Sequence, residues 1–163
     1  MRRASPQYEE AEPLLQRALQ IREQTLGQNH PDIAPVLNVL ASSSLRQEKY
    51  EQAEAFYQRA LQLLKEALGA EHPEIAHPLD GLAHLYAEQG KDEDAEALYQ
   101  RALRLWEKVL GPEHYERAYP LTGLADLYRR QGKKEQAEQL YQQALRTWEQ
   151  TLGSEHPQDG SIV

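Results

Sequence analysis

An internal repeat of 42 residues constrains the fold of this chain more than any other feature of its sequence. Four alanines, Ala18, Ala60, Ala102 and Ala144, lie 42 residues apart, and each stands in a similar stretch of sequence. The stretch 50–76, YEQAEAFYQRALQLLKEALGAEHPEIA, therefore occurs almost four times. A period between about 20 and 50 residues is typical of solenoids, in which similar units stack on one another.

Each repeat contains two segments with helical periodicity. In the longer segment, Ala53, Tyr57, Ala60 and Leu64 belong to an apolar stripe with steps of three and four residues. A glycine with a left-handed backbone is expected to end this helix at Gly27, Gly69, Gly111 and Gly153. A shorter periodic run follows, at 79–86 in the second complete unit. Each repeat is thus predicted to be a hairpin of a shorter helix A and a longer helix B, and the hairpins must stack to bury their stripes.

The repeats predict the organisation of the chain. We expect a disordered N-terminal segment at residues 1–7, an array at 8–153 and a flexible tail at 154–163. The array begins with a single helix at 8–26, and its hairpins span about 33–69, 75–111 and 117–153.

The first complete unit is the least regular. It has Ser42-Ser43-Ser44 where the second unit has His84-Leu85-Tyr86, and Glu48 replaces the turn glycines Gly90 and Gly132. Serine side chains favour competing local hydrogen bonds. The helix at about 34–47 is therefore predicted to be the weakest element of the array.

Composition limits the classes of partner. The net charge is −8, whereas nucleic acids and anionic membranes are bound by basic surfaces. The absence of cysteine excludes disulfides and thiolate metal ligands. No apolar stretch is long enough to span a membrane, and we expect no signal peptide after Met1. We therefore expect a cytoplasmic protein that binds neither nucleic acid nor membrane.

The repeat resembles a known family. The run L-x-x-L-A-x-L-Y-x-x-x-G, followed by A-x-x-L/F-Y-x-x-A-L, is similar to the tetratricopeptide repeat. The matching residues are Leu79, Leu82, Ala83, Leu85, Tyr86, Gly90, Ala95, Leu98, Tyr99, Ala102 and Leu103. That family has a repeat of about 34 residues, so about eight more lie in the longer helix B and in the G-x-x-H-P connection. HEAT and armadillo repeats have comparable periods but fit the Ala, Tyr and Gly spacing poorly.

The resemblance covers residues 8–157, and the longer unit is similar to the repeats of kinesin light chain and of bacterial signalling proteins with kinesin-light-chain-like arrays. It implies an all-α fold, a right-handed α-solenoid of stacked antiparallel helical hairpins.

Two patterns of histidine suggest metal binding, but the geometry of helices argues against it. His30, His72, His114 and His156 recur in the connection, and equivalent positions of stacked hairpins lie roughly 10 Å or more apart. These histidines are interpreted as part of the helix start, with proline at the first helical position. On the helix of the second unit, His77 and His84 are about 10 Å apart and cannot share one ion, although Asp80 with one histidine could. We expect no metal site.

No catalytic constellation is present. The sequence has no glycine-rich phosphate loop, no H-E-x-x-H motif and no cysteine nucleophile, and no histidine is placed to activate Ser42–Ser44. We expect no enzymatic activity and no cofactor.

The resemblance implies where a partner binds, because the A helices of this family line a concave groove. Aligning Leu40, Leu82 and Leu124 gives the positions that project into the groove. These are Asn38, Ser42 and Arg46 in the first unit, His77, Asp80, His84 and Glu88 in the second, and Tyr119, Thr122, Asp126 and Arg130 in the third.

Motifs of known ligand classes in the family are mostly missing. Family members that clamp a C-terminal carboxylate use a set of lysine, arginine and asparagine side chains, of which only Asn38 is kept. Kinesin light chains often read L-N-N-L-A in helix A, whereas the later units here read Asp80-Gly81 and Thr122-Gly123 in place of the two asparagines.

Two hypotheses for function follow. The first is a scaffold that holds a partner peptide or protein in the groove by polar contacts and aromatic anchors. The alternative is a spacer or self-assembly segment of a longer array in a multidomain signalling protein.

The ends of the array are expected to be uncovered. Repeat arrays need polar caps, and neither the helix at 8–26 nor the helix at 134–152 has one. Leu145, Trp148 and Leu152 lack the following repeat that would cover them. We expect either a longer array, which is the preferred explanation, or pairing end to end with a second copy.

Overall fold

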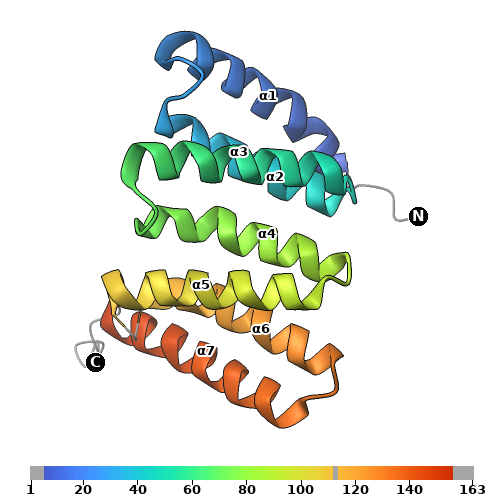
Figure 1. The fold of residues 1–163 in the computed structure, drawn as a ribbon, viewed down its shortest axis with the longest axis vertical. Helices are drawn as coiled ribbons and strands as arrows, with labels where there is room; N and C mark the ends of the chain where they lie inside the picture. The colour runs from blue at the N-terminus through green and yellow to red at the C-terminus, as the bar shows by residue number, and fades with distance from the viewer. Residues whose placement is uncertain (1–5, 112–113, 156–163) are drawn as a thin grey trace, which may run out of the picture.

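The computed structural model of the chain describes residues 6–111 and 114–155, which form seven α-helices stacked along one axis (Figure 1). A single helix, α1 (Pro6–Leu26), comes first. Three hairpins follow: α2 (Ala34–Arg46) with α3 (Tyr50–Leu68), α4 (Ala76–Glu88) with α5 (Asp92–Leu110), and α6 (Ala118–Arg130) with α7 (Lys134–Glu155). These residues contain no strand. The predicted all-α solenoid of stacked antiparallel hairpins is confirmed.

The two kinds of helix form two layers. The shorter helices α2, α4 and α6 approach one another in series with Cα atoms within 8 Å, whereas in the described part of the chain no two of the longer helices come this close. The longer helices α1 and α3 meet through long side chains, such as Arg59 and Glu23 at 2.7 Å. The A helices therefore lie closer together than the B helices. This difference puts the A helices on the inner face of the stack, as the resemblance implied.

Some helix ends differ from the prediction. Helix α1 begins at Pro6 instead of Tyr8, and α7 continues through Gly153 to Glu155. The other predicted end glycines do end their helices with a positive φ, of 89° at Gly27, 92° at Gly69 and 84° at Gly111. Glycine permits this conformation without imposing it, because a helix can continue through glycine at a cost of about 1 kcal/mol. The expected disordered segments fall mainly on residues 1–5 and 156–163, which lie outside the described residues.

Each hairpin begins with a 3₁₀ turn that is capped by the repeated histidine. The turns are Pro31–Ile33, Pro73–Ile75 and Tyr115–Arg117. Nδ1 of His30, His72 and His114 accepts a hydrogen bond from the backbone N–H two residues later, at 3.1, 3.2 and 3.3 Å. This satisfies an N–H group that the start of a helix leaves without a partner. The histidines thus start the helices, as interpreted from the sequence, and His156 lies outside the described residues.

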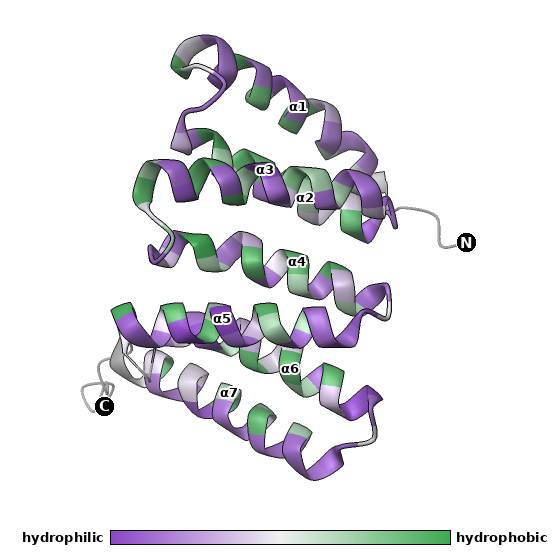
Figure 2. Ribbon diagram, viewed as in Figure 1, coloured by the Kyte–Doolittle hydropathy of each residue, from purple (hydrophilic) through white to green (hydrophobic). Residues whose placement is uncertain are grey.

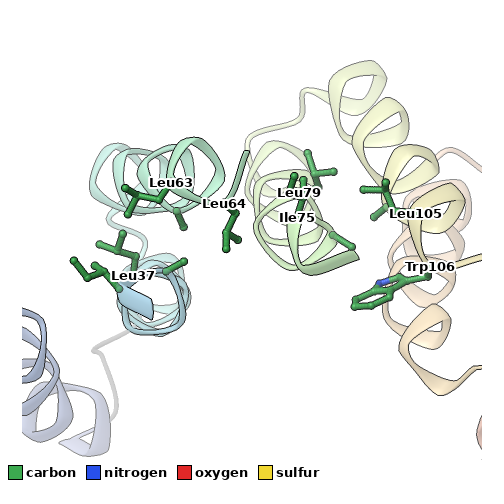
Figure 3. Packing of buried hydrophobic residues seen from close by; sticks show 12 residues of the cluster. Leu37, Leu63, Leu64, Ile75, Leu79, Leu105 and Trp106 are labelled. Carbon is green, nitrogen blue, oxygen red and sulfur yellow. The ribbon is translucent and has the colours of Figure 1, made fainter. Parts of the chain in front are cut away.

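The apolar core runs along the stack as a continuous ribbon. Leu37 and Leu64 of the first hairpin and Ile75, Leu79 and Trp106 of the second are buried in one cluster (Figure 3). Every helix carries both hydrophobic and hydrophilic residues (Figure 2), so each hairpin covers the apolar side of its neighbour.

A tyrosine of one hairpin packs directly against a glycine of the next. A Cβ atom added to Gly81 of α4 would lie 2.8 Å from the hydroxyl oxygen of Tyr57, and one added to Gly123 of α6 would lie 2.7 Å from that of Tyr99. The ring of each tyrosine therefore fills the space that a side chain of the next helix A would need.

Candidate functional site

Two cavities lie between successive A helices, one repeat apart. The first, of about 390 Å³, lies between α2 and α4 and is lined by Ala34, Pro35, Asn38, Leu64, Glu74 and His77. The second, of about 330 Å³, lies between α4 and α6 and is lined by Ala76, His77, Asp80, Trp106, Tyr115, Glu116, Tyr119 and Pro120. The two cavities are built from equivalent positions, because most residues of the second lie 42 positions after a residue of the first.

One lining residue of each cavity has a buried oxygen atom without a hydrogen-bond partner. These atoms are Oδ1 of Asn38 and Oδ1 of Asp80, and no described residue donates to either. A buried polar atom without a partner costs about 1–3 kcal/mol. The third copy of the position is different, because Thr122 Oγ1 donates to the carbonyl of Ala118 at 2.7 Å. Only the first two copies of this position therefore present an unused acceptor.

The surroundings of Asp80 favour its neutral form. Burial, followed by the negative charge of Glu116, raises the pKa of Asp80 to about 7. Burial, followed by lesser effects that include the charge of Asp80, also raises the pKa of Tyr57 to about 12 and the pKa of Tyr99 still further. The charge of Asp80 thus acts on both of the tyrosines that pack against the glycines of the A helices.

The structure brings four of the predicted site residues to the cavities. Asn38 and Asp80 supply the unpartnered oxygens, His77 borders both cavities, and Tyr119 lines the second with about half of its side chain exposed. His77 also packs edge-on against Trp106, with ring centroids 5.2 Å apart.

Several of the predicted residues contact other parts of the array. Nη1 of Arg130 donates to the carbonyl of Ala87 at 3.0 Å, and the hydroxyl of Tyr141 donates to Asp126. These two contacts hold α6 against α4 and α7, whereas the hydrogen bond from Thr122 to Ala118 lies within α6.

The remaining predicted residues belong to the first two A helices. Ser42 lies beside Tyr57 and partly offsets the rise of the Tyr57 pKa that burial causes. His84 Nε2 lies 3.9 Å from Glu88 Oε1, and both side chains are exposed, as is Arg46. None of these four residues lines either of the two cavities.

The sequence analysis missed the cavity residues that do not lie on A helices. Leu64 and Trp106 come from the apolar stripes of B helices, and Glu74 and Glu116 come from the 3₁₀ turns. In the sequence, Leu64 and Trp106 occupy one position of the repeat and Glu74 and Glu116 another. This recurrence is the pattern that could have indicated a repeated site. The resemblance implied groove positions on the A helices alone, so it did not point to these residues.

The described residues contain no cluster of three or more histidine, aspartate or glutamate side chains that could hold a metal ion. In the same part of the chain, every helix is too short or too polar to cross a membrane.

The match of the repeat to known sequences establishes the family. The family model of the tetratricopeptide repeat matches three overlapping stretches, residues 2–66, 36–107 and 74–150. The chain belongs to the tetratricopeptide-repeat family. Its helix A and helix B are the two helices of that repeat.

Solved structures of other tetratricopeptide-repeat proteins share this fold. BtubC (BKLC) from P. vanneervenii is 22% identical in sequence to this chain and has a TM-score of 0.74. The match covers 90% of this chain and 59% of that protein. Two further crystal structures contain nearly identical TPR-like repeats of a kinesin light chain from Podosopora anserina. Each of them is 25% identical in sequence to this chain. Their TM-scores are 0.67 and 0.63, over 90% and 89% of this chain and 69% of theirs.

The tetratricopeptide-repeat chain thus spans less than two thirds of the length of BtubC. No curated protein matches it.

Proposed function

We propose that this tetratricopeptide-repeat chain is a non-enzymatic scaffold that binds an extended segment of a partner protein along the face of α2, α4 and α6. Repeats of this family generally mediate interactions between proteins. The observation that carries the proposal is the repeated cavity, which offers an unpartnered acceptor at Asn38 and again at Asp80.

The geometry of the two cavities suits an extended peptide. Packed helices lie about 8–10 Å apart, and an extended chain advances about 3.3 Å per residue. Side chains about three positions apart in such a peptide would therefore reach both cavities. Donors on the peptide would satisfy Asn38 Oδ1 and Asp80 Oδ1, which supplies affinity because these atoms have no protein partner.

Selection from a display library of random twelve-residue peptides tests this function. We expect the wild type to enrich peptides that a triple variant, Asn38→Ala, Asp80→Ala and Tyr119→Ala, no longer retains. A matched control replaces three exposed glutamines at one position of the B helices, Gln58→Ala, Gln100→Ala and Gln142→Ala, and should retain the peptides. Equal enrichment by the wild type and the groove variant would show that the groove is not the binding surface.

A second candidate function, self-assembly into a longer array, is supported by the exposed ends. Trp148 of α7 is 39% exposed, whereas its counterpart Trp106 of α5 is 6% exposed. At the other end, Ile21 of α1 is 48% exposed, whereas its counterpart Leu63 is 4% exposed. In both cases the interior copy is covered by a neighbouring helix, and no described helix covers the end copy, so each end face is available to stack on another repeat.

A further inference from the structure

The cavity between α4 and α6 differs in chemistry from its copy between α2 and α4. Where the first cavity has the neutral amide of Asn38, the second has the carboxyl group of Asp80. Leu64 is replaced by Trp106, and His77 by Tyr119, while an acidic residue is kept at Glu74 and Glu116. The second cavity is therefore both more acidic and more aromatic than the first.

Among the described residues, no cationic side chain forms an ion pair with Asp80 or Glu116 of this cavity. Among the residues that line it, only His77 can carry a positive charge, and no described residue donates to Asp80 Oδ1. The nearby guanidinium of Arg117 donates to Glu107 Oε1 at 2.6 Å, so its charge is engaged by α5. A buried carboxylate without a partner is costly, and a cation that enters the site removes this cost.

Aromatic side chains form the walls of the same cavity. Trp106 packs against His77, and Tyr119 packs edge-on against Trp148, with ring centroids 6.2 Å apart. Tyr115 lies with its centroid 6.0 Å from that of Trp148. Aromatic faces attract ammonium and guanidinium groups, and arginine stacks on them as well.

We propose that the cavity between α4 and α6 binds a basic side chain, arginine or lysine, of the partner segment that lies in the groove. This proposal rests on the proposed function and adds the chemical class of the partner. The net charge of −8 on the whole chain favours the approach of a basic segment. The raised pKa of Asp80 agrees with this assignment, because a bound cation would stabilise the ionised carboxylate.

The first cavity then defines a second position of the partner. Asn38 Oδ1 accepts a hydrogen bond without a charge, so an uncharged donor is expected there. With a spacing of roughly 10 Å between the cavities, the basic residue and the donor should lie about three positions apart in the segment.

Titration of the isotope-labelled chain with Nα-acetyl-arginine amide, followed by NMR, tests the proposal. We expect shifts of the Trp106 indole N–H and of the backbone amides of Asp80, Glu116 and Tyr119. The neutral isostere Nα-acetyl-citrulline amide and the anionic Nα-acetyl-glutamate amide should cause none. In Asp80→Asn the affinity for the arginine derivative should fall roughly tenfold, because a charged hydrogen bond is lost.

Glu138→Gln is the matched control, since it removes one negative charge from an exposed position of α7 and should bind like the wild type. Backbone amides outside the cavity should be unchanged in Asp80→Asn, which shows that this variant is folded. Equal binding of the citrulline or glutamate derivative, or full affinity in Asp80→Asn, would overturn the proposal.

The peptide selection separates this proposal from the proposed function. Groove-dependent peptides without an arginine or lysine would refute the basic side chain and leave the scaffold function standing. If no groove-dependent peptide is enriched and the arginine derivative does not bind, both proposals fail.

Discussion

Gly81 and Gly123 each stand inside a helix A, where glycine costs about 1 kcal/mol relative to alanine. Both are explained by the tyrosine that the preceding helix B packs against them, Tyr57 and Tyr99. The first unit has a different pair at the same positions, with Val39 in place of the glycine and Leu15 in place of the tyrosine. The large tyrosine and the small glycine therefore occur together at both interfaces between hairpins.

Gly81→Ala is expected to destabilise the chain by about 1–3 kcal/mol in spite of its better helix propensity, because the new Cβ atom would overlap the buried ring of Tyr57. Urea denaturation measures the change. In a Tyr57→Leu background, the same substitution should be nearly neutral or stabilising, since leucine does not reach the added atom. Additive effects of the two substitutions would contradict the matched pair.

The stability of Asp80→Asn relative to the wild type is expected to depend on pH. The pKa of Asp80 rises from 3.8 to about 7 on folding, so between about pH 4 and 7 the folded state holds a proton that the unfolded state has lost. The wild type therefore loses stability as the pH rises through this window, and the amide does not titrate. The free energy of unfolding of Asp80→Asn minus that of the wild type should therefore be about 1–3 kcal/mol larger above pH 7 than at pH 4.

Urea denaturation across this pH range measures the difference. The other ionisable groups around Asp80 are the same in both proteins, so their effects on the stability difference largely cancel. These groups are Glu116, Tyr119, Tyr57, Tyr99, His77 and His84. Glu138→Gln should show no such dependence. A difference between Asp80→Asn and the wild type that is constant from pH 4 to 8 would mean that Asp80 titrates near its ordinary pKa.

At the scale of one element, α2 keeps its full length but differs from α4 and α6 in how it ends. All three A helices have 13 residues. In α2, Ser43 and Ser44 are buried, and Ser44 Oγ donates to the carbonyl of Leu40 at 2.9 Å. Glu48 follows α2 with a φ of 60°, where Gly90 and Gly132 have 76° and 79°. A positive φ costs a residue with a side chain about 1–2 kcal/mol.

We expect hydrogen exchange to show weaker protection at residues 36–47 than at residues 79–89. The small polar side chains of α2 bury less apolar surface than the side chains at the same positions of α4. The positive φ of Glu48 also makes the turn after α2 less stable. Glu48→Gly should stabilise the chain by about 0.5–1 kcal/mol and should raise the protection of residues 36–47. Equal protection of the two segments in the wild type would mean that α2 is not the weakest helix.

At the scale of the whole molecule, the two end faces expose apolar surface that the interior repeats bury. Leu145, Trp148 and Leu152 of α7 are exposed, as are Leu14, Ile21 and Leu26 of α1. Exposed apolar patches of this kind promote association.

We expect the isolated chain to associate at high micromolar concentration, and Trp148→Glu to reduce the mass measured by light scattering, because a charge would be buried in the contact. Gln142→Glu, which adds the same charge to an exposed position of the same helix, should behave like the wild type. Pairing end to end is excluded if the wild type is a monomer and Trp148→Glu changes neither mass nor solubility.

The sequence by itself determined the elements and their order. Helical periodicity is a local property, so Ala53, Tyr57 and Leu64 were enough to predict α3, and the 42-residue offset carried that result to the other units. The capped helix starts at His30 and His72 are local as well. One helix cannot bury its apolar stripe alone, so the sequence also predicted that the hairpins stack.

Only the tertiary structure decided which of these side chains form a site. The cavity at Asp80 is lined by residues of α4, α5 and the third hairpin. No local sequence pattern predicts that these three segments surround a carboxyl group. The role of Gly81 was equally hidden, because it depends on Tyr57 across the interface between two hairpins. Gly153 shows the same limit, since glycine allows a turn without imposing one and α7 continues through it. Burial and close approach depend on contacts between distant residues, and a repeat pattern specifies only that such contacts recur.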